Sequence, residues 1–350
     1  MNDKLSKMFL TASFFCTILV VCIHYNSLYH FKEVEFSDFS FFTQLYLTSG
    51  LARVAVPFFA FASGVFLFLK FDLTQKHYKN AVKKRAMSLA VPYLIVASIV
   101  FIFSTLLNHY NAREYSLNFN SVFYALITPQ TVQLWYIRDL LFLVIISPAI
   151  YFACKNYGKL TIVCAFSLWL FEVQIFPLFG KWYMISIETF FFFTLGCYFS
   201  KKMDVLEKLI NQCSTLTAIG FTILFATLML TRTISEPQFN NWYSHSYTLQ
   251  SLMLHKFGII FGLMSVLVWS FKLKIDKILY LSKFTFFVYL YHLMPLSSFI
   301  LLFWNNFVTE KNLFFVTTPT SLILSFAIAM TMNKYFTKLY QLLSGGRTVN

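Results

Sequence analysis

The sequence has few charged residues for its length. Only 12% of its 350 residues are Asp, Glu, Lys or Arg, whereas soluble globular chains have about 25%. Prolines and glycines are also few, eight and ten respectively, which excludes the disordered and fibrous chains that those residues build. Hydrophobic residues make up 58% of the chain and aromatic residues 20%. This balance excludes a soluble protein and indicates a membrane protein.

Several motifs that carry chemistry are missing as well. The six cysteines form no C-x-x-C pair and the chain has no H-E-x-x-H, so neither a zinc site nor a disulfide framework is indicated. No phosphate-binding loop, no G-x-S-x-G elbow and no dinucleotide fingerprint occurs. We therefore expect no metal and no tightly bound cofactor, and we interpret the cysteines as small apolar packing residues.

Apolar runs recur along the whole chain. Each has about the length that a helix needs to cross the roughly 30 Å hydrocarbon core of a bilayer. They predict an all-α polytopic membrane protein with about ten transmembrane helices, in a single integral-membrane domain over residues 1–350. The ten runs cover residues 8–28, 51–69, 86–107, 134–153, 160–176, 183–200, 214–231, 252–271, 284–304 and 314–333.

The basic residues predict the orientation. The net charge is +14, which in a soluble protein would suggest nucleic acid, but membrane proteins retain Lys and Arg in their cytoplasmic loops. With the amino terminus inside, 20 of the 28 Lys and Arg residues lie on the cytoplasmic side. We therefore predict that both termini are cytoplasmic, that the partner of the apolar surface is the lipid bilayer, and that no nucleic acid is bound.

Nine ionisable residues lie inside the apolar runs or at their ends. A charge at membrane depth is costly, so each such residue is a functional candidate by default. The predicted orientation puts all of them except His292 in the outer halves of their helices, which predicts a polar chamber open to the outside. His24 stands out because histidine titrates near neutral pH and can accept a proton. The nine residues are His24, Arg53, Arg138, Asp139, Glu172, Glu188, His255, Lys256 and His292.

Packing roles remain open for most of these residues. Arg138 and Asp139 are adjacent on one helix, so we expect each to pair with a different helix and not with the other. Lys256 could extend its ammonium group to the membrane interface. Glu172 and Glu188 could simply neutralise nearby cations.

A basic segment, KHYKNAVKKRAMSLAVPY at 76–93, precedes the third run. Such a segment usually fixes the topology or contacts anionic lipid. It could instead bind a cytoplasmic ligand that carries phosphate, because Lys and Arg are well suited to phosphate. The candidate residues for that second role are Lys83, Lys84 and Arg85.

Five segments, taken together and in order, resemble the bacterial integral-membrane acyltransferase family 3, and the resemblance covers most of the chain. The first two map a histidine onto His24 and an arginine onto Arg53, and the third is the basic segment running into a proline-bearing helix. The segments are ILVVCIHYNS at 18–27, ARVAVPFFAFASGVFLF at 52–68, KKRAMSLAVPYLI at 83–95, LWYIRDLLFLVIISP at 134–148 and FTFFVYLYHLMPL at 284–296.

The resemblance implies an enzyme of the bacterial cytoplasmic (inner) membrane. It implies acyl-CoA, usually acetyl-CoA, as the cytoplasmic donor, and a hydroxyl of an envelope glycan or lipid-linked sugar as the external acceptor. His24 would be the catalytic general base, or alternatively a nucleophile that is acylated transiently. The implied substrate-binding residues are Arg53, Trp135, Arg138, Asp139, Glu188 and His292, and the implied donor-binding residues are Lys83, Lys84 and Arg85.

Within those substrate-binding residues, Asp139 or Glu188 would orient His24, and Arg53 or Arg138 would stabilise oxyanion charge.

Two parts of the sequence depart from the family's pattern. Where many members have an arginine eleven residues before the histidine this chain has Ser13, and Leu10 replaces the accompanying aspartate. In the basic segment, Ser88 follows Arg85 where a second arginine is common. Lys83 or Lys84 would then supply a point charge in place of a missing arginine.

Other functions fit the same composition. A transporter, flippase or glycan polymerase would also need many helices and a polar chamber, although the chain shows no internal repeat of the kind many transporters have. A membrane-bound acyltransferase of the other superfamily would use Tyr291 and His292 as its relevant pair. Consumption of a thioester by the purified protein separates acyltransferases from the other classes.

Overall fold

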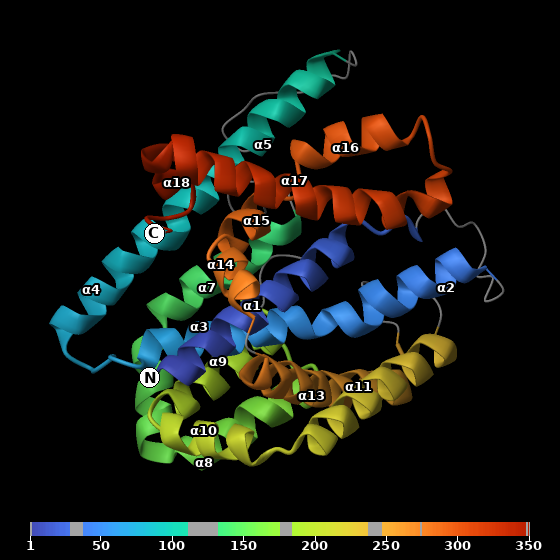
Figure 1. Ribbon diagram of the computed structural model, residues 1–350. Coiled ribbons are helices and arrows are strands. Elements are labelled where there is room, and N and C mark those ends of the chain that lie inside the picture. Colours follow the sequence, from blue (N-terminus) through green and yellow to red (C-terminus); the bar gives the residue numbers. More distant parts are fainter. Residues whose placement is uncertain are drawn as a thin grey trace.

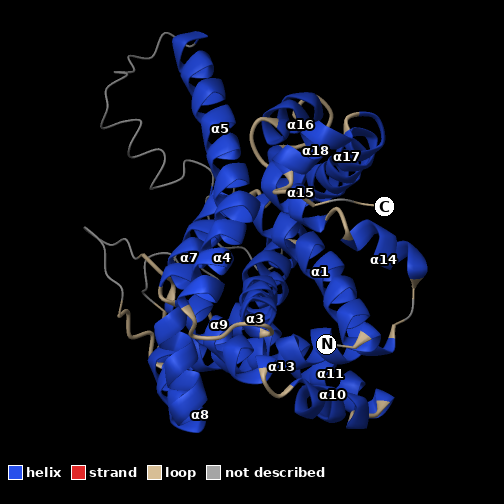
Figure 2. Ribbon diagram, turned by 90° about the vertical axis from the view of Figure 1, so that its left-hand side faces the viewer, coloured by secondary structure: helices blue, strands red, loops and turns tan. Residues whose placement is uncertain are grey.

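The computed structural model describes residues 2–28, 38–110, 132–175, 184–236, 247–273, 275–347 and 349. Throughout these ranges the regular structure is helical and contains no strand, so the predicted all-α fold is confirmed. Most helices lie side by side in one bundle, while α4 (Gln75–Arg85) and α5 (Val91–Tyr110) form a long rod along one flank (Figures 1 and 2).

Six helical segments in the described ranges are long and apolar enough to cross a membrane. Two of them combine several helices: α2 (Phe39–Leu45) continues into α3 (Ala55–Phe68), and α4 continues into α5. The six are α1 (Asp3–His24), Phe39–Phe68, Tyr78–Leu107, α11 (Thr215–Ser235), α13 (Leu249–Lys272) and Glu310–Tyr335, which contains α17 (Leu313–Tyr335).

Two bent helix pairs are long and apolar enough for a further span each when their two halves are counted together. α7 (Trp135–Ile145) and α8 (Ser147–Leu170) meet at 65°, and α15 (Thr285–Tyr291) and α16 (Leu296–Trp304) meet at 70°. Pro148 lies in the first turn of α8 and Pro295 directly precedes α16. Proline breaks a helix because it has no backbone N–H and its ring clashes with the preceding turn.

Each of the ten predicted runs contains helix in its described part, but the described helices form six to eight spans by length and composition. The runs at 134–153 and 160–176 both fall in the α7–α8 pair, and α8 itself departs from helical backbone angles at Tyr157. The run at 183–200 forms α9 (Ile187–Ser200), which is shorter than a full span. Three short helices complete the description: α10 (Met203–Gln212), α14 (Asp276–Ser282) and α18 (Thr337–Leu343).

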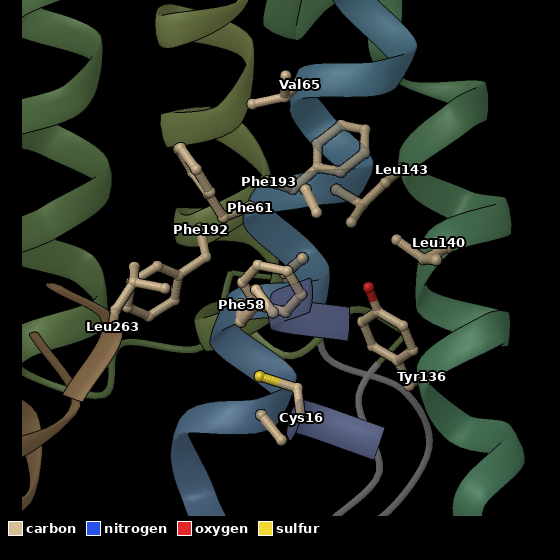
Figure 3. Close-up of a cluster of buried hydrophobic side chains, with 14 of the residues drawn as sticks. Cys16, Phe58, Phe61, Val65, Tyr136, Leu140, Leu143, Phe192, Phe193 and Leu263 are labelled. Carbon is tan, nitrogen blue, oxygen red and sulfur yellow. The ribbon is translucent and has the colours of Figure 1, made fainter. Parts of the chain in front are cut away.

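The core centres on the contact between α3 and α9. A Cβ atom on Gly64 would lie 2.2 Å from the carbonyl oxygen of Phe193, and one on Gly196 would lie 2.2 Å from that of Phe61. Small residues let membrane helices pack this closely. Figure 3 shows the apolar side chains around this contact, among them Phe58 and Phe61 of α3 and Phe192 and Phe193 of α9. All six cysteines are free thiols, and Cys16 is buried in this core.

Both chain ends lie at the same end of the bundle in Figure 1, near α4. The assignment of both termini to the cytoplasm stays a prediction. A labelling test of this assignment needs exposed positions. Serines near the predicted outer ends are unsuitable, since only 2% of Ser27 and 6% of Ser49 are exposed.

We expect a cysteine at Asn306, between α16 and α17, to react with an impermeant thiol reagent added outside the cell. A cysteine at Asn80, on α4, should react only after the membrane is permeabilised. Both side chains are exposed, so the difference would report sidedness and not burial. The native cysteines are replaced first. External labelling at Asn80 with protection at Asn306 would establish the inverted topology.

Candidate active site

The structure brings together two histidines that are far apart in the sequence. His24 is the last residue of α1, and His292 directly follows α15 at the bend before α16. Their ring centroids are 5.3 Å apart. His24 is half-buried and His292 is fully buried. We call these two residues the histidine pair.

The orientation of His292 is fixed by its surroundings. Its Nδ1 atom lies 2.9 Å from the carbonyl oxygen of Tyr289 and 3.0 Å from that of Val288. Both neighbours are acceptors, so Nδ1 carries the proton and the lone pair of the neutral ring is on Nε2. The hydroxyls of Tyr25 and Ser321 donate to the backbone carbonyl of His292, at 2.5 and 3.3 Å. His292 therefore presents a proton-accepting nitrogen, and that Nε2 has no hydrogen-bond partner among the residues that the structure describes.

Arg53 lies within electrostatic reach of His24. It belongs to the short helical turn η3 (Leu51–Val54) that precedes α3, and it is half-buried. Its positive charge interacts with His24 and also with Glu188 on α9. The charge of Arg53 therefore acts on both the histidine pair and a second polar cluster around Glu188.

Arg138 and Asp139 pair with each other, which corrects the prediction that each would face a different helix. Arg138 Nη2 lies 3.1 Å from Asp139 Oδ1, and both residues are buried. The expectation considered only the diverging Cβ directions, whereas the long arginine side chain folds back toward its neighbour. Asp139 Oδ2 accepts a hydrogen bond of 2.8 Å from the backbone N–H of Ser186, just before α9. Asp139 thus ties α7 to the start of α9.

Glu188 belongs to the second polar cluster, together with Glu172, Lys256 and Trp169. Trp169 Nε1 donates to Glu188 Oε2 at 3.2 Å, and Lys256 Nζ lies 4.6 Å from the centroid of the Trp169 ring. Lys256 forms an ion pair with Glu172. The lysine is fully buried, so the prediction that it reaches the interface is wrong, and the prediction that Glu172 neutralises a cation is confirmed.

A row of aromatic rings leads away from the histidine pair. The Tyr289 ring centroid is 6.5 Å from that of His292, 6.2 Å from that of Tyr136 and 6.5 Å from that of Phe59. Trp135, at the start of α7, is half-buried and packs edge-on against Tyr136 at 6.1 Å. The aromatic row, Tyr289, Tyr136 and Phe59, therefore extends from the histidine pair into the bundle.

The aromatic row lines one side of a cavity of about 320 Å³. Three cations line the same cavity, Arg85, Lys283 and Arg347, and its described lining contains no carboxylate. A space whose described lining has several basic side chains and no carboxylate favours an anionic ligand. We call this space the cationic cavity.

The predicted donor-binding residues separate in the structure. Arg85 lines the cationic cavity, whereas Lys83 and Lys84 are exposed on α4 and are not part of that lining. Sequence reasoning missed Lys283 and Arg347 as site residues. In the sequence these two residues were counted only among the basic residues of the predicted cytoplasmic side. Their approach to Arg85 could not be predicted, because it depends on how α14 and the chain end pack.

Comparisons with known proteins concern the chain as a whole and not its individual site residues. The model of a family described as an acyltransferase domain (Acyl_transf_3) matches residues 14–334. The succinoglycan biosynthesis protein ExoH of Rhizobium meliloti (strain 1021) is 23% identical over 220 residues, which cover 60% of this chain and 57% of that protein. The match therefore spans less than two thirds of that relative's length. No solved structure matches the chain. Because the family model covers nearly the whole chain, this protein belongs to the acyltransferase 3 family.

Proposed function

We propose that this protein transfers an acyl group, most often acetyl, from cytoplasmic acyl-CoA to a hydroxyl of an envelope glycan or lipid-linked sugar, at the outer face of the bacterial cytoplasmic membrane. One observation carries the proposal: the aromatic row joins the histidine pair to the cationic cavity. Proton transfer chemistry lies at one end of this arrangement, and groups suited to phosphate lie at the other.

The donor fits the cationic cavity by its chemistry. Coenzyme A has a phosphate-rich head and a slender pantetheine arm that ends in the thioester. Arg85 would pair with phosphate, and the arm would lie along Tyr136 and Tyr289, which line the cavity on the way to His292. The thioester has to reach about half the bilayer, roughly 15 Å. Coenzyme A is then a substrate, and no resident cofactor is required.

The reaction needs one base and one stabilised oxyanion. His24 takes the proton of the acceptor hydroxyl while that oxygen attacks the thioester carbonyl carbon. Arg53 stabilises the negative charge that develops on the carbonyl oxygen. The carbon–sulfur bond then breaks, and the departing thiolate takes the proton from His24. The products are an ester on the sugar and free coenzyme A.

The sugar acceptor is supported by the relative's name, which refers to succinoglycan biosynthesis, and succinoglycan is a polysaccharide. A transporter, flippase or glycan polymerase would use the same number of helices without acyl transfer. The aromatic row between a cationic cavity and two histidines is an arrangement that these other functions do not require.

The test is thioester consumption by the purified protein in lipid vesicles supplied with acetyl-CoA and an envelope glycan. We expect free coenzyme A to appear together with a glycan whose mass has increased by one acetyl group. A sealed vesicle with the donor on the inside and the glycan outside also tests the sidedness. Absence of thioester consumption by folded protein, with movement of the glycan across the membrane, would support a flippase instead.

Arg85 should matter more to donor use than its basic neighbours do. We expect Arg85→Gln to raise the KM for acyl-CoA about tenfold, because a charge-assisted hydrogen bond to phosphate contributes roughly that much to binding. The double variant Lys83→Gln, Lys84→Gln is the matched control, because it removes two exposed charges from the same helix. Its donor KM should change little. Equal effects of the two changes, or an unchanged KM in Arg85→Gln, would indicate that the basic segment fixes the topology and does not bind the donor.

A further inference from the structure

The chain end turns back onto the junction of α4 and α5. α18 ends at Leu343 with a glycine turn, in which Gly346 N–H donates to Gln341 O at 2.7 Å and Gly345 N–H donates to Leu342 O at 3.4 Å. Both glycines have positive φ angles, +68° and +78°, as this type of helix end requires. A Cβ atom on Gly345 would lie 2.3 Å from the carbonyl oxygen of Ser88. The turn therefore packs directly against the basic segment.

The turn delivers Arg347 to the cationic cavity. Arg347 Nη1 donates to the carbonyl oxygens of Ser88 and Ser344, at 3.2 and 2.6 Å. Its guanidinium carbon lies 3.6 Å from the centroid of the Phe286 ring, a cation–π geometry. Ser344 Oγ donates to the Arg347 carbonyl oxygen at 3.3 Å. These contacts hold the side chain of the fourth residue from the chain end in a defined place.

The charged residues that line the cavity in the described part of the chain are all basic. Arg347, Arg85 and Lys283 line it together, and the described lining residues include no Asp or Glu. Burial, and then the neighbouring charge of Arg85, lower the pKa of Arg347 to about 10, so the guanidinium stays protonated at neutral pH. An anion bound between the two arginines would offset both the lost hydration and the repulsion.

We propose that Arg347 is a second ligand for donor phosphate, opposite Arg85, and that the turn at Ser344–Arg347 closes the cytoplasmic side of the donor site. The ligand class is the phosphate ester of a nucleotide-bearing thioester. The inference rests on the proposed function, since it assigns a partner to the donor of that reaction. Arg347 lies outside residues 14–334, which the family model matches, so membership of the family does not itself assign it this role.

Binding measurements separate the phosphate contact from a purely structural one. The purified protein is placed in phosphatidylcholine nanodiscs, and the affinities for coenzyme A and for pantetheine, which has no phosphate, are measured by calorimetry. We expect Arg347→Gln to weaken coenzyme A binding about tenfold and to leave pantetheine binding unchanged. Arg347→Lys keeps the charge and should recover part of the loss.

Lys338→Gln is the matched control. Lys338 is an exposed basic residue of α18, so this variant removes one positive charge from the same chain end without touching the cavity. Its coenzyme A affinity should equal that of the wild type. In turnover experiments, Arg347→Gln should raise the KM for the donor and leave the KM for the glycan as it was.

Each failure has a separate meaning. If the wild type binds no coenzyme A, the donor in the proposed function is wrong. If the wild type binds it and Arg347→Gln binds it equally well, the inference is overturned while the proposed function stands. Loss of both coenzyme A and pantetheine binding would make Arg347 a structural residue and also overturn the inference. The affinity of the protein for phosphatidylglycerol is compared as well. If Arg347→Gln binds coenzyme A as the wild type does but binds phosphatidylglycerol more weakly, the inference is overturned and the arginine is assigned to a lipid headgroup.

Discussion

Replacement of His24 by alanine is expected to lower the rate of acyl transfer by about 10²- to 10⁴-fold, the usual effect of removing a general base. His24 has the position for that role, because it lies at the end of α1, its ring is 5.3 Å from that of His292, and the charge of Arg53 acts on it. The measurement is acetylation of the glycan by the purified variant at saturating acetyl-CoA.

The change should affect chemistry and not folding. His24 is half-buried at a helix end, so an apolar replacement leaves membrane insertion intact. Asn26→Ala is the matched control, because Asn26 is a half-buried polar neighbour whose amide donates to the backbone carbonyl of Ile23. We expect its rate to remain close to that of the wild type. Near-normal acetylation by His24→Ala at the wild-type protein level would reject His24 as the base.

In that event His292 becomes the candidate base, because its Nε2 carries the lone pair and has no partner in the described part of the chain. The two assignments give opposite results in one comparison. With His24 as the base, His292→Gln removes a neighbour of the base and should reduce the rate less than His24→Ala does. With His292 as the base, the order of the two variants is reversed.

Hydropathy predicted the long apolar helices of the bundle, but not its shorter helices α2, α4, α10, α14 and α18, nor how the helices are joined. A run of apolar residues shows that a segment prefers lipid or core, and this property does not change at a bend. Pro148 and Pro295 lie at the two sharp bends, and the proline positions were visible in the sequence. The 65° and 70° angles were not, because they depend on what packs against each half of the pair.

The site was predictable where a residue type is costly at membrane depth. His24, Arg53 and His292 were candidates for that reason, and the structure places them near one another. The pairing of residues was less predictable, as Arg138 and Asp139 show, because a flexible side chain reaches partners that Cβ directions exclude.

Arg347 was missed as a cavity residue because its place there depends on the contact of the chain end with Ser88 in the basic segment. The same cavity is lined by Ser13, which stands where the resemblance has an arginine, and by Arg347 from the chain end. A sequence shows that an arginine is missing from an expected position. It does not show that another arginine, more than 300 residues away, lies in the same space.

The second large effect concerns the buried ion pair of Lys256 and Glu172. We expect Lys256→Met to lower the free energy of unfolding by about 3–5 kcal/mol, because it leaves the Glu172 carboxylate without its partner in a low-dielectric region. The lysine side chain is 1% exposed and the glutamate side chain 19%. Thermal or denaturant unfolding of the purified variant in detergent measures the loss.

The double variant Lys256→Met, Glu172→Gln decides whether the loss comes from the unpaired charge or from packing. Removing both charges should recover most of the stability, since neutral groups of similar volume need no counterion. Lys311→Met is the matched control, because Lys311 pairs with Asp38 at 3.7 Å with half of its side chain exposed, and such pairs contribute about 0–1 kcal/mol. A double variant no more stable than Lys256→Met would show that the lysine stem and its contact with the Trp169 ring, and not the ion pair, hold α13 against α8.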